Sequence, residues 1–227
     1  MLEINQLEIY RDKFKISLPH LRLNAGEIWG LKGNSGCGKS TLLEIIGLIL
    51  KPAQLGEYKL CVDGQWQEIS ELVRQQQQKS LAQLRAQHFG FMLQSGGLLP
   101  FLTVQDNIQL SSQLIERTLD QQWLDYLIGK LKVGHLLQNY PKQLSIGERQ
   151  RISFIRSIAH QPNILLADEP TASLDPENSL DLFKLITQLV SENKMSALVV
   201  SHDWELLANH DVQMLTAHID DHHSIFK

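Results

Sequence analysis

Residues 33 to 41 read Gly33-Asn34-Ser35-Gly36-Cys37-Gly38-Lys39-Ser40-Thr41 and fit the pattern GxxxxGK[ST] at every fixed position. The segment before them, 27–31, alternates like a β-strand, and the segment after them, 41–48, has apolar residues at helical spacing. Glycines let backbone N–H groups line a nest for phosphate oxygens, and the helix N-terminus adds partial positive charge. A glycine-rich turn with a chance lysine would leave the matching flanks unexplained. The stretch therefore predicts a nucleoside triphosphate site.

Four side chains around this loop have defined chemistry at a bound triphosphate. Lys39 is expected to reach the β- and γ-phosphates, and the Ser40 hydroxyl is expected to ligate Mg²⁺. Asp168 and Glu169 directly follow an apolar segment, 163–167, that is typical of a strand buried on both faces in a parallel sheet. At that strand tip Asp168 would support Mg²⁺, and Glu169 could accept a proton from an attacking water. The alternative interpretation is that Asp168 and Glu169 are simply two acids in an ordinary turn at the end of a strand.

A histidine, His202, follows the next predicted strand, 196–200, within the sequence Ser201-His202-Asp203. A lone histidine at a strand end is usually structural. Because the tips of parallel strands meet at one sheet edge, however, His202 is expected on the same edge as the phosphates. The glycine loop and the two strand tips therefore predict one common site.

Composition limits the class of protein. A chain of 227 residues with 43% hydrophobic residues suffices for one large α/β domain, or for one domain with a subdomain. The net charge of −4 gives no general attraction to nucleic acid, so no nucleic-acid partner is expected. Two cysteines without CxxC spacing, Cys37 and Cys61, favour a reducing compartment over a disulfide or zinc site. No secretory leader pattern is present, and the longest apolar run, 45–50, falls far short of the roughly 20 residues that span a bilayer. We expect a soluble, cytoplasmic chain that reaches a membrane through a partner.

Periodicity predicts a β-rich N-terminal region, 2–32, followed by a short strand and turn at 58–69. The polar run at 71–87 reads as a solvated helix or connector without chemistry. Further strands and helices alternate along the chain: strands at 88–93, 163–167, 196–200 and 212–217, and helices at 103–132 (with Thr103 and Asp120 as N-caps), 147–160, 176–192 and 204–209. This alternation predicts an α/β fold with a doubly wound parallel sheet, interrupted by a helical insert over residues 95–160.

With these motifs the chain resembles the ATP-binding subunits of ABC transporters over essentially its whole length. Gln94 stands where the family has its Q-loop glutamine, and residues 144–148, Leu144-Ser145-Ile146-Gly147-Glu148, occupy the place of the LSGGQ signature. Residues 173–175 stand at the D-loop. The resemblance implies a P-loop NTPase cassette with a mostly parallel sheet core, an N-terminal antiparallel β subdomain and a helical subdomain, all in one ATP-binding domain spanning residues 1–227.

The resemblance also implies roles for individual residues. Glu169 would be the catalytic base, His202 the switch histidine, and Gln94 a further residue of the catalytic site. Tyr10 would stack on adenine, with Phe14 as the second choice. The ATP-binding residues would be Tyr10, Gly33, Asn34, Ser35, Gly36, Cys37, Gly38, Lys39, Ser40, Thr41, Ser145, Gly147, Glu148 and Asp175, and the Mg²⁺ ligands would be Ser40, Gln94 and Asp168.

The signature departs from the family pattern at two positions. Glu148 in place of glutamine is familiar in the lipoprotein-releasing and macrolide-export types of cassette, whose ERQR run this chain shares. Ile146 in place of the first glycine is less usual. A β-branched residue is poorly tolerated at positive φ, so the backbone at Ile146 is expected to adopt an ordinary conformation. Ser145 and Gly147 keep the hydroxyl and the open helix N-terminus that would face a γ-phosphate.

Two other segments stand out. Residues 96–102 are unusually apolar for a loop and are expected to be more buried than exposed. In a cassette this segment borders the groove for a helix of the membrane subunit, which suits helix-in-groove recognition. The histidine-rich C-terminal segment, 218–223, could bind a metal, but a mobile solvated tail is the stronger expectation.

We therefore expect an ATP-hydrolysing ABC transporter subunit that acts as a homodimer or heterodimer and powers a separate membrane permease, for export or extraction. It would lie in the cytoplasm, on the inner face of the membrane. A non-transport cassette that regulates cell-wall or division machinery would share every motif. A DNA-repair or translation cassette usually carries coiled-coil inserts or tandem cassettes, and a small-molecule P-loop kinase leaves the signature and His202 unexplained. The substrate and the direction of transport cannot be read from the sequence.

Overall fold

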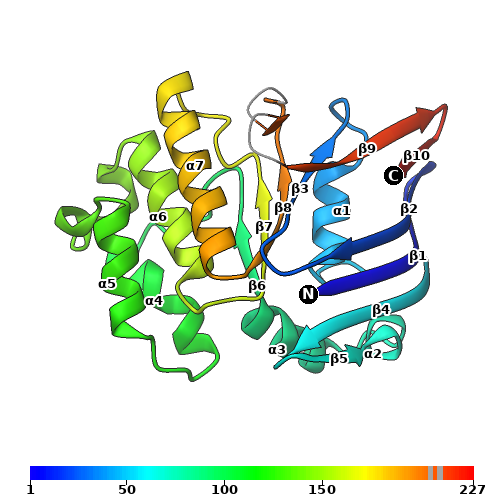
Figure 1. Cartoon of the computed structure of the whole chain (residues 1–227), viewed down its shortest axis with the longest axis horizontal. Coiled ribbons are helices and arrows are strands. Elements are labelled where there is room, and N and C mark those ends of the chain that lie inside the picture. Colours follow the sequence, from blue (N-terminus) through cyan, green and yellow to red (C-terminus); the bar gives the residue numbers. More distant parts are fainter. Residues whose placement is uncertain (204–206, 209–211) are drawn as a thin grey trace.

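A computed structural model describes residues 1–203, 207–208 and 212–227. Within these residues ten strands form one mixed sheet (Figure 1). In sheet order they are β5 (Gln65–Glu68), β4 (Gln54–Val62), β1 (Leu2–Arg11), β2 (Phe14–Leu23), β10 (His223–Phe226), β9 (Gln213–Asp220), β3 (Ile28–Lys32), β8 (Ser196–Val200), β7 (Ile164–Asp168) and β6 (Phe89–Met92). The α-helices with described bounds are α1 (Lys39–Ile46), α2 (Ser70–Arg74), α3 (Gln78–His88), α4 (Val104–Leu114), α5 (Gln121–Lys130), α6 (Ile146–Ile158) and α7 (Pro176–Glu192), and short 3-10 helices lie at Gly134–Leu136 and Pro141–Gln143.

The parallel half of the sheet consists of β9, β3, β8, β7 and β6, each parallel to its neighbours in this half. β7 and β8 are buried almost throughout, as strands covered on both faces must be. In β7, Ile164 and Leu166 belong to one hydrophobic cluster, whereas Leu165 and Ala167 belong to the other. This two-residue alternation lets a short strand bury both faces. The predicted α/β fold with a parallel core is confirmed.

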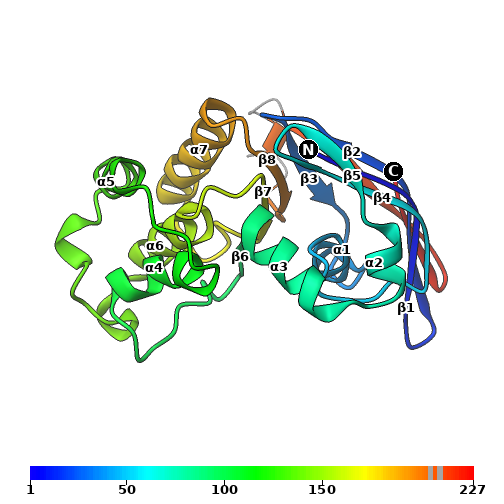
Figure 2. The ribbon, with the colours of Figure 1, turned by 90° about the horizontal axis from the view of Figure 1, so that it is seen from below.

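Helices cover both faces of this parallel half (Figure 2). Helix α1 contributes Leu42, Ile45 and Ile46 to the cluster that also contains the apolar side chains of β1, β2 and β4. Helices α4 to α7 build the second cluster on the opposite face. None of the helices in the described part of the chain is long and apolar enough to cross a bilayer.

The antiparallel half is built on β1, which pairs with β2 along one edge and with β4 along the other. Along β1 the buried residues alternate with polar ones, so one face packs on α1 and the other faces solvent. This half is the N-terminal antiparallel subdomain that the resemblance implied.

The histidine-rich C-terminal segment is part of the sheet, so the expectation of a mobile tail is wrong. β9 and β10 form a hairpin, and β10 pairs in parallel with β2. Nε2 of His223 lies 2.8 Å from the Ser17 hydroxyl oxygen, and Phe226 is fully buried. The hairpin joins the two halves of the sheet. Among the described residues, no group of three or more His, Cys, Asp or Glu side chains is placed to hold a metal ion.

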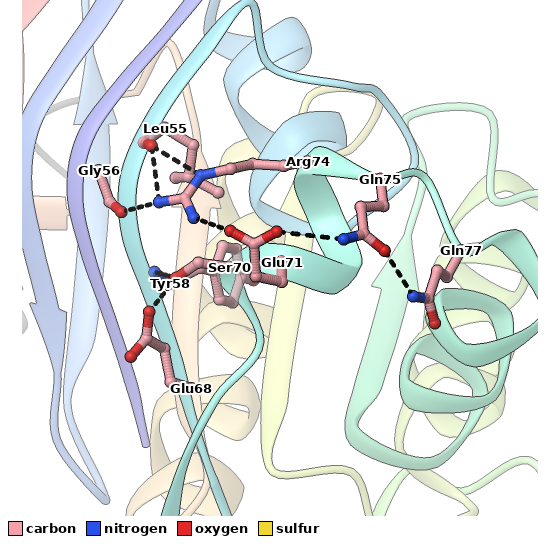
Figure 3. A network of polar contacts seen from close by, with 9 residues as sticks. All are labelled: Leu55, Gly56, Tyr58, Glu68, Ser70, Glu71, Arg74, Gln75 and Gln77. Atoms are coloured by element: carbon pink, nitrogen blue, oxygen red, sulfur yellow. Dashed lines mark hydrogen bonds and ion pairs between the residues drawn. The ribbon is translucent and has the colours of Figure 1, made fainter.

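The polar run at 71–87 forms most of α2 and α3, which agrees with a solvated helical connector. Arg74, at the end of α2, donates hydrogen bonds to the carbonyl oxygens of Leu55 and Gly56 at the start of β4 (Figure 3). Its guanidinium also pairs with Glu71 at 2.5 Å. The bonds to Leu55 and Gly56 attach α2 to the antiparallel strands, whereas the pair with Glu71 lies within the helix.

The first two helices of the helical insert begin at the predicted N-cap residues. The Thr103 hydroxyl accepts a hydrogen bond from the backbone N–H of Asp106, and Asp120 accepts one from the backbone N–H of Trp123. Thr103 and Asp120 therefore start α4 and α5 as predicted. The short helix expected over 204–209 lies mostly outside the described residues.

Candidate functional site

The phosphate loop joins the carboxyl end of β3 to the first residue of α1. Gly36 and Gly38 have positive φ values of 79° and 97°, which glycine adopts without the steric cost of a Cβ atom. The Ile16 side chain of β2 also fills the space where a Cβ of Gly38 would lie. A Cβ at Gly33 would lie 2.8 Å from the Cβ of Ala217 on β9. The loop therefore needs glycine both for its backbone and for its packing.

The Lys39 side chain lies inside this loop. Its ammonium group donates hydrogen bonds to the carbonyl oxygens of Gly33 (2.8 Å) and Asn34 (3.0 Å). The residue is 6% exposed, so the two carbonyls compensate a nearly buried charge. Together with the N-terminus of α1, this ammonium makes the loop complementary to an anion.

Glu169 directly follows β7, and the chain turns at this residue, where the backbone φ is 52°. Its backbone N–H donates to the carbonyl oxygen of Val200 at 2.9 Å, which extends the pairing of β7 with β8. Left-handed φ values in residues other than glycine are uncommon and cluster at functional sites. The residue is 6% exposed, and this burial raises the pKa of the Glu169 carboxyl above its usual range. A raised pKa makes the carboxylate a better proton acceptor.

His202 lies beside this carboxylate, just beyond the end of β8. Its Nε2 atom lies 3.3 Å from Oε1 of Glu169, and its backbone N–H donates to Oε2 at 3.3 Å. Among the described residues Oε1 of Glu169 has no hydrogen-bond partner, so it can take a further donor such as water. The imidazole itself is more than half exposed and can reach a ligand in front of the loop.

One cavity of about 370 Å³ unites these groups. Its walls come from the phosphate loop, from the tips of β7 and β8, and from the segment after β6. The lining residues are Ser35, Gly36, Gly38, Lys39, Ser40, Thr41, Gln94, Asp168, Glu169, Val200 and His202. The structure thus brings together residues that the sequence suggested from four separate segments.

Gln94 is held at the edge of this cavity by a residue that the sequence analysis did not single out. The carbonyl oxygen of Gln94 accepts a hydrogen bond from Nε2 of Gln150 on α6 at 3.2 Å. Gln150 is 4% exposed, and a buried glutamine needs such a partner. The available signal in the sequence was that Gln150 lies on the apolar face of α6, where its side chain would be buried. The bond connects the helical insert to the nucleotide side of the fold.

The signature residues stand at the N-terminus of α6 and do not line this cavity. Ser145 is the N-cap, and its hydroxyl and backbone N–H both donate to Oε2 of Glu148 at 2.8 Å. These bonds lower the pKa of the Glu148 carboxyl. Ile146 occupies the first turn of α6, so its expected ordinary backbone conformation is confirmed, and its side chain is about half exposed.

Five other predicted ATP-binding residues also lie outside the cavity lining: Gly33, Asn34 and Cys37 within the phosphate loop, and Asp175 and Tyr10 away from it. Asp175 caps α7, where its carboxylate accepts hydrogen bonds from the side chain (2.7 Å) and the backbone N–H (3.1 Å) of Asn178, which lower its pKa. Tyr10 is exposed at the end of β1, with the Lys15 ammonium 6.0 Å from its ring centroid. Their roles stay predictions.

The apolar loop 96–102 is fixed by the buried side chain of Asn107. Its amide accepts from the backbone N–H of Leu99 at 2.8 Å and donates to the Leu99 carbonyl at 3.1 Å. The leucines of this loop are partly buried, but Phe101 is 71% exposed. The expectation of burial is therefore wrong for Phe101.

A phosphate loop between a strand and a helix, facing carboxylates at the tip of a parallel strand, defines a P-loop nucleotide hydrolase. The sequence model of the family described as ABC transporter matches residues 17–172. The chain belongs to this family, and it is an ABC-type ATPase subunit.

Several known proteins are similar to it. The lipoprotein-releasing system ATP-binding protein LolD of Shewanella oneidensis is 36% identical over 196 residues, which cover 86% of this chain and 81% of the relative. The macrolide export ATP-binding/permease protein MacB of Rhodopirellula baltica is 37% identical over 191 residues, which cover 82% of this chain and 26% of the relative. Among solved structures, the dimeric post-hydrolysis state of the ATP-binding cassette MJ0796 bound to ADP and Pi has a TM-score of 0.78 at 26% identity, covering 99% of this chain and 96% of that chain.

Proposed function

We propose that this chain binds ATP with Mg²⁺ in the cavity described above, hydrolyses it as a dimer, and thereby drives a separate integral membrane permease. The contact of Glu169 with His202 in front of the phosphate loop carries this proposal. It places a buried carboxylate of raised pKa and an exposed imidazole beside the same ammonium-bearing loop.

The nucleotide would lie along residues 33–41, with Tyr10 against the adenine. Lys39 would exchange its two carbonyl acceptors for oxygens of the β- and γ-phosphates, because an ionised phosphate is the stronger acceptor. The loop N–H groups and the N-terminus of α1 would hold the remaining phosphate oxygens.

The residues present fit a magnesium ion. Ser40, Gln94 and Asp168 share the cavity wall and offer hydroxyl, amide and carboxylate oxygens, which are the hard ligands that Mg²⁺ prefers. Bound there, the ion would neutralise charge on the phosphate oxygens. Glu169 would take the proton of the attacking water through Oε1, which lies 3.3 Å from Nε2 of His202 but accepts no hydrogen bond among the described residues. His202 would hold that carboxylate and contact the transferred phosphoryl group.

The second half of the site would come from another protomer. Ser145, Gly147, Glu148 and Asp175 lie at exposed or half-exposed helix N-termini outside their own chain's cavity, where they would face a partner's nucleotide. A dimer of this chain, or a heterodimer with a similar chain, would close on two ATP molecules. The dimeric MJ0796 cassette supports this arrangement.

Identity of 35–37% to LolD and MacB proteins supports a permease partner of the lipoprotein-releasing or macrolide-export kind. We propose extraction or export, with the chain bound to the cytoplasmic face of the permease. Residues 1–227 would form one ATP-binding domain, with a helical subdomain at about 95–160.

Hydrolysis measured against protein concentration tests the proposal. The rate per molecule should rise with concentration in the presence of ATP and Mg²⁺, because a dimer is needed, and it should vanish with EDTA. A rate per molecule that is independent of concentration, from a chain that stays monomeric, would refute the two-protomer site. A membrane permease that copurifies with the chain would identify the partner.

A further inference from the structure

At the N-terminus of α6, the Glu148 carboxylate accepts hydrogen bonds from donor groups that a partner's phosphate would need. Oε2 of Glu148 accepts the hydroxyl and the backbone N–H of Ser145, both at 2.8 Å. In return, the Ser145 hydroxyl oxygen accepts the backbone N–H of Glu148 at 3.3 Å. Serine has one hydroxyl proton, so a second acceptor can take it only by displacing Glu148.

This carboxylate is ionised at neutral pH, because the bonds from Ser145 lower the pKa of Glu148. The charged or titratable groups that act on it are His135 and Arg151, which favour the ionised form further. Arg151 also donates to the side chain of Asn178, so it is shared with the start of α7. A negative charge therefore stands at the helix terminus that would receive the partner's γ-phosphate.

We propose that Glu148 is an electrostatic latch that opposes closure of the ATP-bound dimer. This inference rests on the proposed two-protomer site, in which Ser145 and Gly147 face the nucleotide held by the partner. There the Glu148 carboxylate and the γ-phosphate compete for the Ser145 proton and for the positive end of α6. The latch raises the concentration at which two ATP-bound protomers associate, and closure requires Glu148 to turn away from Ser145.

The chain offers a matched control at the start of α4. Thr103 and Asp106 form the same capping box: the Thr103 hydroxyl donates to Oδ2 of Asp106 at 2.6 Å and accepts the Asp106 backbone N–H at 3.1 Å. Asp106→Asn and Glu148→Gln each remove one negative charge from a helix cap and keep an amide oxygen as acceptor. The two variants differ in location, because α4 lies outside the proposed nucleotide interface.

The test measures ATP-dependent dimerisation by sedimentation velocity over a range of protein concentrations. Three proteins are compared: Glu169→Gln, which retains ATP, and the same chain with either Glu148→Gln or Asp106→Asn. Glu148→Gln should lower the concentration for half-dimerisation about threefold to thirtyfold, since two sites per dimer lose a repulsion of like charges. Asp106→Asn should leave it unchanged. Raising NaCl from about 50 to about 500 mM should shrink the Glu148→Gln effect, which distinguishes lost charge from a new amide contact.

Two outcomes would overturn the latch. A dimerisation threshold that Glu148→Gln leaves unchanged or raises would overturn the latch alone, because the dimer itself would still form. A Glu169→Gln chain that stays monomeric with ATP at every concentration would overturn the two-protomer site, and the latch with it.

Discussion

The Nε2 atom of His202 lies 3.3 Å from Oε1 of Glu169, while the His202 backbone N–H lies 3.3 Å from Oε2 of the same carboxylate. A single residue that follows β8, His202, therefore contacts both carboxylate oxygens of Glu169, which follows β7. Because the Glu169 N–H also bonds to Val200, backbone pairing fixes the position of the carboxylate relative to the phosphate loop. The sheet therefore places the proposed base, Glu169, and the backbone contact from His202 helps to orient its carboxylate.

Replacement of this carboxylate should separate binding from turnover. Glu169→Gln keeps the shape of the side chain but cannot accept a proton at neutral pH, so hydrolysis should fall by about 10²-fold or more. ATP affinity, measured by titration calorimetry, should stay near the parent value because the phosphate loop is intact. Hydrolysis at the parent rate would show that the base is another residue.

Ile146 and Gly147 should respond differently to substitution. Ile146→Gly should change activity only modestly, since Ile146 is helical and its side chain is half exposed. Gly147→Asp should abolish hydrolysis but spare ATP binding to the isolated chain. A Cβ at Gly147 meets nothing closer than Leu174 at 3.7 Å, so the monomer has room for it, and the added carboxylate would oppose only a partner's γ-phosphate. Loss of ATP affinity in the monomer would contradict this explanation.

His160 should contribute a pH dependence to stability. It is 4% exposed, its Nε2–H donates to the Phe89 carbonyl at 3.1 Å, and burial lowers its pKa below the ordinary 6.5. Arg117 and His88 act in the same direction. Because the pKa of His160 is lower in the folded chain than in the unfolded chain, the unfolded chain binds this proton at a higher pH. The free energy of unfolding therefore falls as the pH falls below about 6.5.

His160→Gln keeps a donor for the Phe89 carbonyl but does not titrate, so it isolates this contribution. Between about pH 7.5 and about pH 5.5, urea unfolding should show the parent losing more free energy than the variant, by up to about 1.4 kcal/mol per pH unit. Equal pH dependence of the two proteins would contradict the lowered pKa.

The C-terminal hairpin should be a stabilising part of the fold. Phe226 lies on β10, which joins the halves of the sheet, and its side chain is fully buried in the hydrophobic core, so Phe226→Ala should cost about 3–5 kcal/mol of unfolding free energy. The control is Phe101→Ala, which truncates an aromatic side chain that is 71% exposed and should cost little. Similar chemical denaturation midpoints for the two variants would mean that β10 is dispensable.

Much of the fold could be predicted because its signals are local. α7 and β8 occupy the predicted residues 176–192 and 196–200, since a proline and a capping aspartate mark the helix start and an apolar run marks the strand. The phosphate loop is recognisable because glycine is required at fixed positions. The roles of individual site residues stay predictions.

The features that the sequence did not indicate are long-range or depend on alternative partners. The pairing of β10 with β2 joins residues about 200 positions apart, and polar side chains hide the strand pattern of β10, whereas the other strand of the hairpin was predicted at 212–217. The hydrogen bonds from the Lys39 ammonium to carbonyl oxygens of its own loop depend on local geometry that no sequence pattern predicts. Ser145 and Glu148 do fit the S-x-x-E capping box, a readable signal that the comparison with the signature motif obscured.

The central claim is that each ATP is hydrolysed between the phosphate loop of one protomer and the signature helix of another. The most direct test mixes two variants that should each be inactive: Lys39→Ala, which loses the contact to the β- and γ-phosphates, and Gly147→Asp, which blocks the signature helix. A mixed dimer contains one intact site, formed by the phosphate loop of the Gly147→Asp chain and the signature helix of the Lys39→Ala chain. An equimolar mixture should therefore regain about a quarter of the parent ATPase sites, since half of the dimers are mixed and each carries one intact site of two. Rates that equal the sum of the two separate variants at every ratio would contradict the shared site.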